Sequence, residues 1–166
     1  MVASMHVTES PQAIGPTAAK LAAAVSLCRR RGVRLTTMRR RLLDVLLQAG
    51  RPLGAYQLKP LLEVALGRRL APPTVYRALR FLLDQGLIAR IESRSAFVPR
   101  VHPEDPHTGA FLVCGRCGDA TEVDNRALDR LIAGDVAALG FHVDRAVVEL
   151  EGTCGRCLSG GADPPH

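Results

Sequence analysis

Tryptophan is absent from this chain, and aromatic residues make up only 4% of its 166 residues. Proteins that bind single-stranded nucleic acid stack its bases on aromatic side chains, so this composition argues against binding of that kind. No apolar run reaches the roughly 20 residues of a membrane-spanning helix. The segment 18–27 is short, contains Lys20 and is typical of an amphipathic helix. We therefore expect no membrane partner.

Sequence patterns of enzymes are missing too. The chain has no HExxH motif, no glycine-rich phosphate loop and no paired Ser/His/Asp context. These absences argue against a zinc-containing metalloenzyme, which is the rival function from another class of protein. We therefore expect that the chain is not an enzyme and binds no small organic substrate. No signal peptide precedes the chain, so we expect a reducing, cytoplasmic location without stable disulfides.

Lysine is also rare, with two lysines against twenty arginines, and the charge is unevenly distributed. Residues 1–92 hold 15 Lys/Arg and 5 Asp/Glu, a net charge of +10, whereas residues 93–166 hold 7 and 11, a net charge of −4. Base usage in the genome explains part of the arginine excess, but it would not sort the charges by half. The basic part predicts binding to a polyanion, and the acidic part predicts binding to cations.

Four of the five cysteines form two identical CGRC pairs, Cys114 with Cys117 and Cys154 with Cys157. A Cys-x-x-Cys turn brings two thiolates onto one tetrahedral ion, and a second pair completes the shell. Four protein sulfurs leave no open position, so the pattern predicts one structural zinc per chain. Redox switching of the pairs stays an alternative. We expect the odd cysteine, Cys28, to be a half-buried bystander.

Breakers and hydrophobic periodicity predict an α+β protein in two parts. We expect helices at about 17–31, 37–49, 55–66 and 72–85, with Pro60 kinking the third helix or marking a late start. A β-hairpin of residues 87–93 and 95–100 follows. Helices followed by a hairpin are typical of a winged helix-turn-helix, here with one extra helix in front.

The sequence pattern after the hinge predicts a small α/β domain. We expect its strands at 110–114, 120–123 and 143–150 and its helix at about 125–139. The expected boundaries are a disordered tail at 1–16, a winged-helix domain at 17–100, a hinge at 101–108, an α/β domain with the cysteine pairs at 109–158, and a disordered tail at 159–166.

The segment PPTVYRALRFLLDQGLI predicts a DNA-reading helix. Thr74, Tyr76 and Arg77 lie together near its start, and the inward face is expected to hold Leu79, Leu82 and Leu83. Arg can fork onto a guanine edge, and Thr can meet a thymine methyl or a phosphate. Further phosphate contacts are expected from Arg39, Arg40 and Arg41. An ordinary amphipathic helix with solvated arginines stays an alternative.

The motifs VRLTTMRR, AYQLKPLL, PPTVYRAL and RIES, the histidine-containing hinge and the two cysteine pairs follow one another in a familiar order. Over residues 20–157 the chain resembles the Fur superfamily of metal-responsive regulators, and within it the zinc-uptake regulator (Zur) subgroup. The resemblance implies a homodimer that binds an inverted-repeat DNA operator when its regulatory site is loaded. It implies zinc ligation by the four paired cysteines and DNA contacts from Tyr56, Thr74, Tyr76 and Arg77.

The regulatory metal site departs from the pattern of the resemblance. His107 and Glu122 match regulatory ligands, but Ala89 and Arg100 stand where a histidine and a cysteine are expected. Three interpretations of the regulatory site stay open. In the first, His102 and His142 replace the missing ligands. In the second, the site binds its metal weakly or binds a different metal, and in the third, the chain no longer senses metal. The candidate set is His102, His107, Glu122 and His142, with Asp105 also in the hinge.

These observations predict a metal-responsive repressor of metal-uptake genes, with zinc as the structural ion and as the expected regulatory metal. Within the same superfamily, an iron, manganese or peroxide sensor stays the alternative, because two regulatory ligands are replaced.

Overall fold

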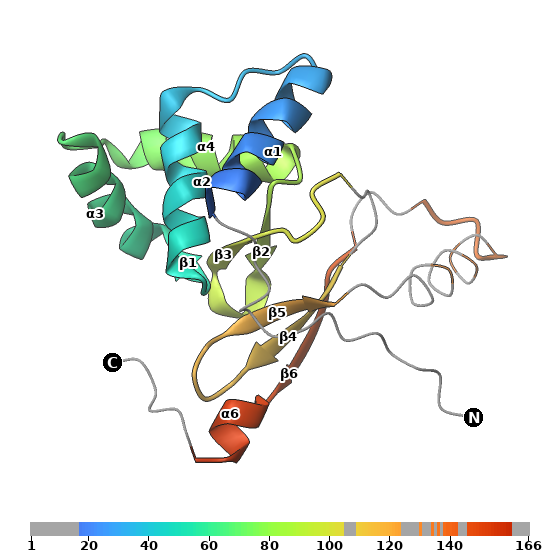
Figure 1. The fold of residues 1–166 in the computed structure, drawn as a ribbon. Helices are drawn as coiled ribbons and strands as arrows, with labels where there is room; N and C mark the ends of the chain where they lie inside the picture. The colour runs from blue at the N-terminus through green and yellow to red at the C-terminus, as the bar shows by residue number, and fades with distance from the viewer. Residues whose placement is uncertain are drawn as a thin grey trace. The chain divides into compact units, whose positions relative to one another are not determined.

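The computed structural model describes residues 17–104, 109–123, 130, 134, 136, 138–142 and 146–160 (Figure 1). The chain divides into two compact units between Asp105 and Pro106, and each unit is described by itself. Helices and antiparallel and parallel strand pairs occur together, so the predicted α+β class is confirmed. In the described ranges, no helix is long and apolar enough to cross a membrane.

The N-terminal unit holds four helices around one apolar core. All four helices contribute leucines to this core, among them Leu42, Leu58 and Leu82, which are fully buried. The helices are α1 (Thr17–Arg30), α2 (Thr37–Ala49), α3 (Ala55–Leu66) and α4 (Pro72–Asp84).

The start and end of α4 follow from local chemistry. Pro72 and Pro73 occupy its first turn, where a missing N–H costs no hydrogen bond. Gly86 ends it with a φ of 63°, a left-handed conformation that glycine adopts without strain. The N–H of Gly86 then donates to the Leu83 carbonyl and that of Leu87 to the Leu82 carbonyl, both at 2.9 Å.

Proline inside α3 does not delay that helix. The helix begins at Ala55 and includes Pro60, so the late start is wrong. The side chain of Gln57 reaches back to accept the N–H of Gly54 at 2.9 Å, which satisfies one of the free donors at the helix start.

The wing is a three-stranded antiparallel sheet rather than the expected hairpin. Strands β2 (Ile88–Ile91) and β3 (Ala96–Pro99) form the hairpin, joined through a 3-10 turn at Glu92–Arg94. Strand β1 (Leu53–Gly54) adds a third member, and the sheet order is β1-β3-β2. Strand β1 could not be predicted from the sequence, because two residues carry no periodicity.

The second unit contains β4 (Ala110–Cys114), β5 (Ala120–Val123), β6 (Val148–Gly152) and the short helix α6 (Gly155–Leu158). Strands β4 and β5 match the prediction. The third strand begins and ends later than predicted, and the expected helix at 125–139 lies mostly outside the described residues. Ser159 and Gly160, expected in a disordered tail, form a turn after α6.

The strand order β5-β4-β6 positions the metal-binding residues. Strand β4 pairs antiparallel with β5 and parallel with β6. Parallel strands end at the same edge of a sheet. Cys114, the last residue of β4, therefore lies opposite Gly152 of β6. This register brings residues 114 and 154, which are 40 positions apart in sequence, to one corner of the sheet.

Candidate metal centre and nucleic-acid interface

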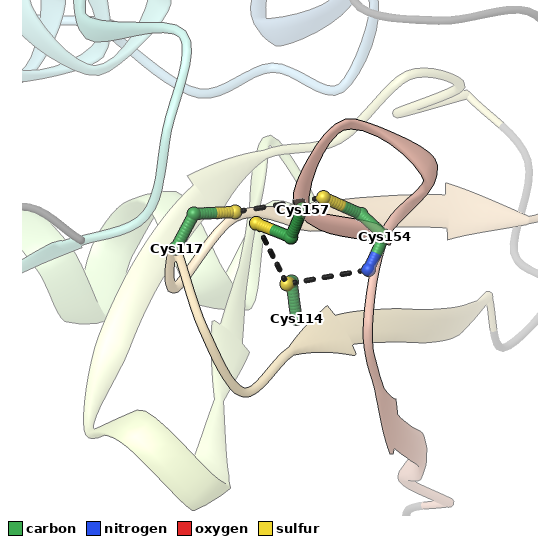
Figure 2. Close-up of side chains that lie close together, drawn as sticks. All are labelled: Cys114, Cys117, Cys154 and Cys157. Atoms are coloured by element: carbon green, nitrogen blue, oxygen red, sulfur yellow. Dashed lines mark hydrogen bonds between the residues drawn. The ribbon is translucent and has the colours of Figure 1, made fainter. Parts of the chain in front are cut away.

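The four paired cysteines converge on one point at the corner of the second sheet. Figure 2 shows their side chains pointing toward one another from the two CGRC turns. All four Sγ atoms lie within 4.8 Å of one another, and no other group of His, Cys, Asp or Glu converges in this way among the residues that the structure describes. Cys114 and Cys157 are buried, and Cys117 and Cys154 are partly exposed.

The spacing of the sulfurs fits a tetrahedral zinc ion. The Sγ atoms of Cys114 and Cys157 are 3.8 Å apart, as are those of Cys117 and Cys154. Sulfurs at a zinc–sulfur distance of about 2.3 Å form a tetrahedron whose edge is about 3.8 Å. A disulfide would need a sulfur–sulfur distance of about 2.05 Å, and all five cysteines are free thiols. The arrangement therefore fits a closed structural zinc site rather than a pair of disulfides.

Backbone donors prepare two of the ligands for the ion. The N–H groups of Cys117 and Cys154 hold the pKa of the Cys114 thiol at about 6, and Cys154 N lies 3.3 Å from Cys114 Sγ. The N–H of Cys157 lowers the pKa of Cys154. Burial raises the pKa of Cys117 and raises that of Cys157 to about 12. Zinc binding requires thiolates, so the raised pKa values of Cys117 and Cys157 oppose binding and the lowered pKa values of Cys114 and Cys154 favour it.

The arginines of the two CGRC turns brace the site reciprocally. Arg116 of the first turn donates from Nη1 to the carbonyl oxygen of Cys157 at 2.7 Å. Arg156 of the second turn donates from Nη2 to Asp119 Oδ2 at 2.6 Å. Each arginine thus reaches the opposite half of the site, which stabilises the approach of the two cysteine pairs. The repeated CGRC letters predict the cysteine site, but they give no role to the two arginines.

Cys28 takes no part in this centre. It was expected to be half-buried, but it is only 1% exposed on α1, so that expectation is wrong. Its side chain belongs to the apolar core of the N-terminal unit. Burial raises the pKa of its thiol, which keeps the sulfur protonated and unreactive.

Helix α4 divides into a buried face and a polar edge. Arg77 and Tyr76 are exposed near its start, and Thr74 is partly exposed. On α3, Tyr56 is 90% exposed. The inward face was only partly predicted, since Leu83 is half-buried while Val75 and Ala78 are buried. This partition fits a helix that presents its first turns to a duplex.

The arginines of α2 differ in their surroundings. Arg40 is exposed, as a phosphate contact requires, whereas Arg41 lies 3.4 Å from Asp44. The guanidinium of Arg39 lies 3.5 Å from the centroid of the Phe81 ring on α4 and donates to the Arg34 carbonyl at 2.8 Å. The phosphate contact of Arg39 stays a prediction, and the structure adds a cation–π contact that braces α2 against α4.

The candidate regulatory ligands are not brought together by the described residues. His102 is exposed in the N-terminal unit, with Nδ1 3.7 Å from Glu104 Oε1. Glu122 on β5 and the exposed His142 belong to the second unit, and His107 lies outside the described residues. Ala89 is on β2 and Arg100 directly follows β3. The regulatory site therefore stays a prediction.

A winged helix with a basic, exposed edge, joined to a unit with a closed four-thiolate site, defines a metal-containing DNA-binding regulator. The sequence profile of the ferric uptake regulator family matches residues 30–151, and the chain belongs to this family. Members of the family are transcription regulators, so the predicted class is confirmed and the metalloenzyme alternative is set aside.

Within this family, the chain is similar to zinc uptake regulators over most of its length. The zinc uptake regulation protein of Escherichia coli is 35% identical over 139 residues, covering 83% of this chain and 81% of that protein. A solved zinc uptake regulator complexed with zinc and DNA is 34% identical, with a TM-score of 0.83 over 89% of this chain and 98% of the other. Holo XcZur is 36% identical, with a TM-score of 0.79 over 87% and 99%.

Proposed function

We propose that this chain is a zinc-dependent repressor that binds an inverted-repeat DNA operator as a homodimer and controls metal-uptake genes. The observation that carries the proposal is the similarity over nearly the whole chain to a zinc uptake regulator solved with zinc and DNA. A repressor acts where the DNA is, so we place the protein in the cytoplasm.

The N-terminal unit supplies the contacts to DNA. Arg77 reads a base edge from the first turns of α4, and Thr74 and Tyr76 contact the adjacent backbone or bases. Tyr56 extends the contact from α3, where almost its whole side chain is free of protein neighbours. Arg40 adds a charge contact that is blind to sequence. The net charge of +10 over residues 1–92 strengthens every one of these contacts.

The second unit supplies the dimer interface. Several large apolar side chains of this unit are exposed. Strand β6 pairs with β4 on one edge only, in the part of the chain that the structure describes. Burying these side chains against a second copy would remove apolar area from water. A two-fold dimer then matches the two-fold symmetry of an inverted-repeat operator. The exposed apolar residues of this unit are Leu112, Leu139, Phe141, Val147, Leu150 and Leu158.

The structural zinc is held by Cys114, Cys117, Cys154 and Cys157, one ion per chain. It joins the end of β4 to the end of β6, so its binding free energy contributes to folding. A closed site of this kind does not exchange readily and is unsuited to sensing. Sensing therefore needs a second divalent ion, for which zinc is the expected metal.

The second ion is proposed to bind at the hinge, through His102, His107 and Glu122, with His142 as a further candidate. Glu122 folds over Gly109, the first described residue after the hinge, so closely that a Cβ on Gly109 would lie 2.5 Å from Glu122 Oε1. The carboxylate thus lies at the end of the hinge, and glycine leaves room for it. Because Ala89 and Arg100 replace two expected ligands, an iron, manganese or peroxide response is the second candidate.

Operator binding titrated against free Zn2+, Fe2+ and Mn2+, with metal content measured alongside, tests the proposal. We expect zinc to raise the operator affinity with two zinc ions per chain, and peroxide to have no effect. The variant His107→Ala should keep the fold, the thiolate-bound zinc and the dimer but lose the zinc response. His6→Ala, which changes no candidate ligand, is the matched control. Equal operator affinity with and without every metal would overturn the proposal.

A further inference from the structure

Arg31 joins two segments that lie far from it in sequence. The residue directly follows α1, and its guanidinium donates from Nη1 to the carbonyl of Gln85 and from Nη2 to the carbonyl of Pro103 at 3.1 Å. Gln85 caps the C-terminal end of α4, and Pro103 lies in the hinge beside His102. One side chain therefore bridges the end of the DNA-reading helix and the start of the candidate regulatory segment.

The chemistry of the acceptors suits this bridge. The last carbonyls of a helix lack partners within the helix and carry the negative end of its dipole. A guanidinium is always charged and holds several donors in a fixed plane, so it can satisfy two carbonyls at once. A lysine ammonium is a single point charge on a flexible stem and cannot impose the same spacing. The fork thus sets how far Pro103 lies from Gln85.

Two further contacts hold the hinge at this place. The N–H of Arg100 donates to the carbonyl of Leu87 at 3.1 Å, one residue beyond the end of β3. Gly86, in its left-handed turn, lies beside the hinge, since a Cβ there would be in ordinary van der Waals contact with the Pro103 carbonyl oxygen, at 3.8 Å. The end of α4 and the hinge therefore form one junction, and Arg31 is the charged side chain that ties it together.

We propose that Arg31 is a positioning residue that latches the hinge to the C-terminal end of α4 and so transmits the metal state of the hinge to the DNA-reading helix. The inference rests on the proposed function, because it assumes that the hinge binds the sensed metal. An ion captured by His102 restrains the next residue, Pro103. Arg31 passes that restraint to α4 and favours the arrangement that engages DNA.

The test uses the full-length protein and measures operator affinity with and without zinc. The coupling between two ligands of one protein is typically about 5- to 150-fold. We expect Arg31→Gln to reduce the zinc enhancement to less than about 5-fold, while the metal-free affinity changes less than about 3-fold. Arg31→Lys keeps the charge but not the fork, and it should reduce the enhancement nearly as much. Arg30→Gln removes a neighbouring exposed charge on α1 and should keep the enhancement.

A phosphate contact would give a different result. If Arg31 touched DNA, Arg31→Gln would weaken metal-free and metal-loaded binding alike and lower the salt slope by about one. That outcome overturns the proposal, as does an unchanged zinc enhancement in both Arg31 variants.

Amide exchange tests the latch without relying on metal binding. In Arg31→Gln the amides of Gly86, Leu87 and Arg100 should exchange faster than in Arg30→Gln. Equal exchange in the two variants would show that no latch exists. A wild-type protein without any zinc enhancement would instead overturn the proposed function, and the exchange result would still decide whether Arg31 ties the junction.

Discussion

The two units of this chain are stabilised by different means. The N-terminal unit buries one continuous cluster of eighteen residues, contributed by all four helices and by the wing. In the second unit, the buried residues within the described ranges are six, and two of them, Cys114 and Cys157, belong to the four-cysteine site. We therefore expect the first unit to fold on its apolar core and the second to depend on the zinc site for much of its stability.

The comparison also separates two uses of arginine. In the N-terminal unit, exposed arginines such as Arg40 and Arg77 remain available for a polyanion. In the second unit, Arg116 and Arg156 hold the two cysteine pairs together. The same residue type thus serves recognition in one unit and the architecture of the metal site in the other.

Loss of one zinc ligand should have the largest effect. Cys117→Ser is expected to lose one zinc per chain, to unfold the second unit and to abolish the dimer, because three thiolates no longer close the tetrahedron. Metal analysis and light scattering check these outcomes. The control Cys28→Ser changes a buried cysteine that is no ligand, so its zinc content should equal that of wild type. A dimeric Cys117→Ser protein with full zinc content would refute the metal dependence of this unit.

A cavity in the N-terminal core should destabilise the N-terminal unit and leave the zinc site of the second unit unchanged. Leu46 is fully buried on α2, and Leu46→Ala is expected to lower the free energy of unfolding by about 2–5 kcal/mol. Denaturant unfolding followed by circular dichroism measures this change, and the zinc content should not alter. Leu61→Ala, at an exposed position on α3, should change stability by only about 0.5 kcal/mol. Zinc loss in Leu46→Ala would contradict the separation of the units.

Removal of the base-reading arginine should affect binding but not folding. Arg77→Ala is expected to weaken operator binding by about 1–3 kcal/mol and to relax the preference at one base pair per half-site. Arg40→Ala should instead weaken all sequences alike and reduce the salt slope by about one. Fluorescence titrations on the operator and on scrambled DNA at several salt concentrations distinguish the effects of these two variants. Unchanged operator affinity in Arg77→Ala would remove α4 from base recognition.

The smallest expected effect depends on pH. A hydrogen bond from Lys59 Nζ, at 2.8 Å, and one from the N–H of Leu70 hold the pKa of Glu63 below its usual value. A lowered pKa in the folded state stabilises the protein above the unfolded pKa of about 4.3 and loses that contribution as the pH falls through the folded pKa. Glu63→Gln should therefore be slightly less stable than wild type at pH 7, and this difference should shrink as the pH falls below about 4.3 toward pH 3. A constant difference in thermal midpoint across this range would show that the carboxylate charge contributes nothing.

Much of the fold could be predicted because its signals are local. The bounds of α2 and α3 and of β4 and β5 match the expectations, since glycines, prolines and apolar periodicity mark them within a few residues. The cysteine site could be predicted because the Cys-x-x-Cys spacing by itself indicates two thiolate ligands for one metal ion. Family membership and the α+β class were likewise readable from motifs in order along the chain.

What could not be predicted depends on contacts between distant segments. The pairing of β1 with β3 joins Leu53 to Phe97, and neither residue signals the other. Arg39 stacks on Phe81, 42 positions away, although its sequence neighbours suggest only a solvated charge. Arg31 reaches Pro103, and Arg116 reaches Cys157, by the same kind of long-range contact. Such contacts are fixed by packing, which a single sequence does not display.

Stepwise removal of zinc tests the central claim most directly. Zinc content, operator affinity and oligomeric state are measured together while a chelator of increasing strength is added to the wild-type dimer. We expect a first zinc ion per chain to leave with loss of operator affinity, while the dimer and the fold persist. The thiolate-bound ion then leaves only with unfolding of the second unit. A single zinc ion per chain, with operator affinity unchanged until the protein unfolds, would contradict a zinc-responsive regulator.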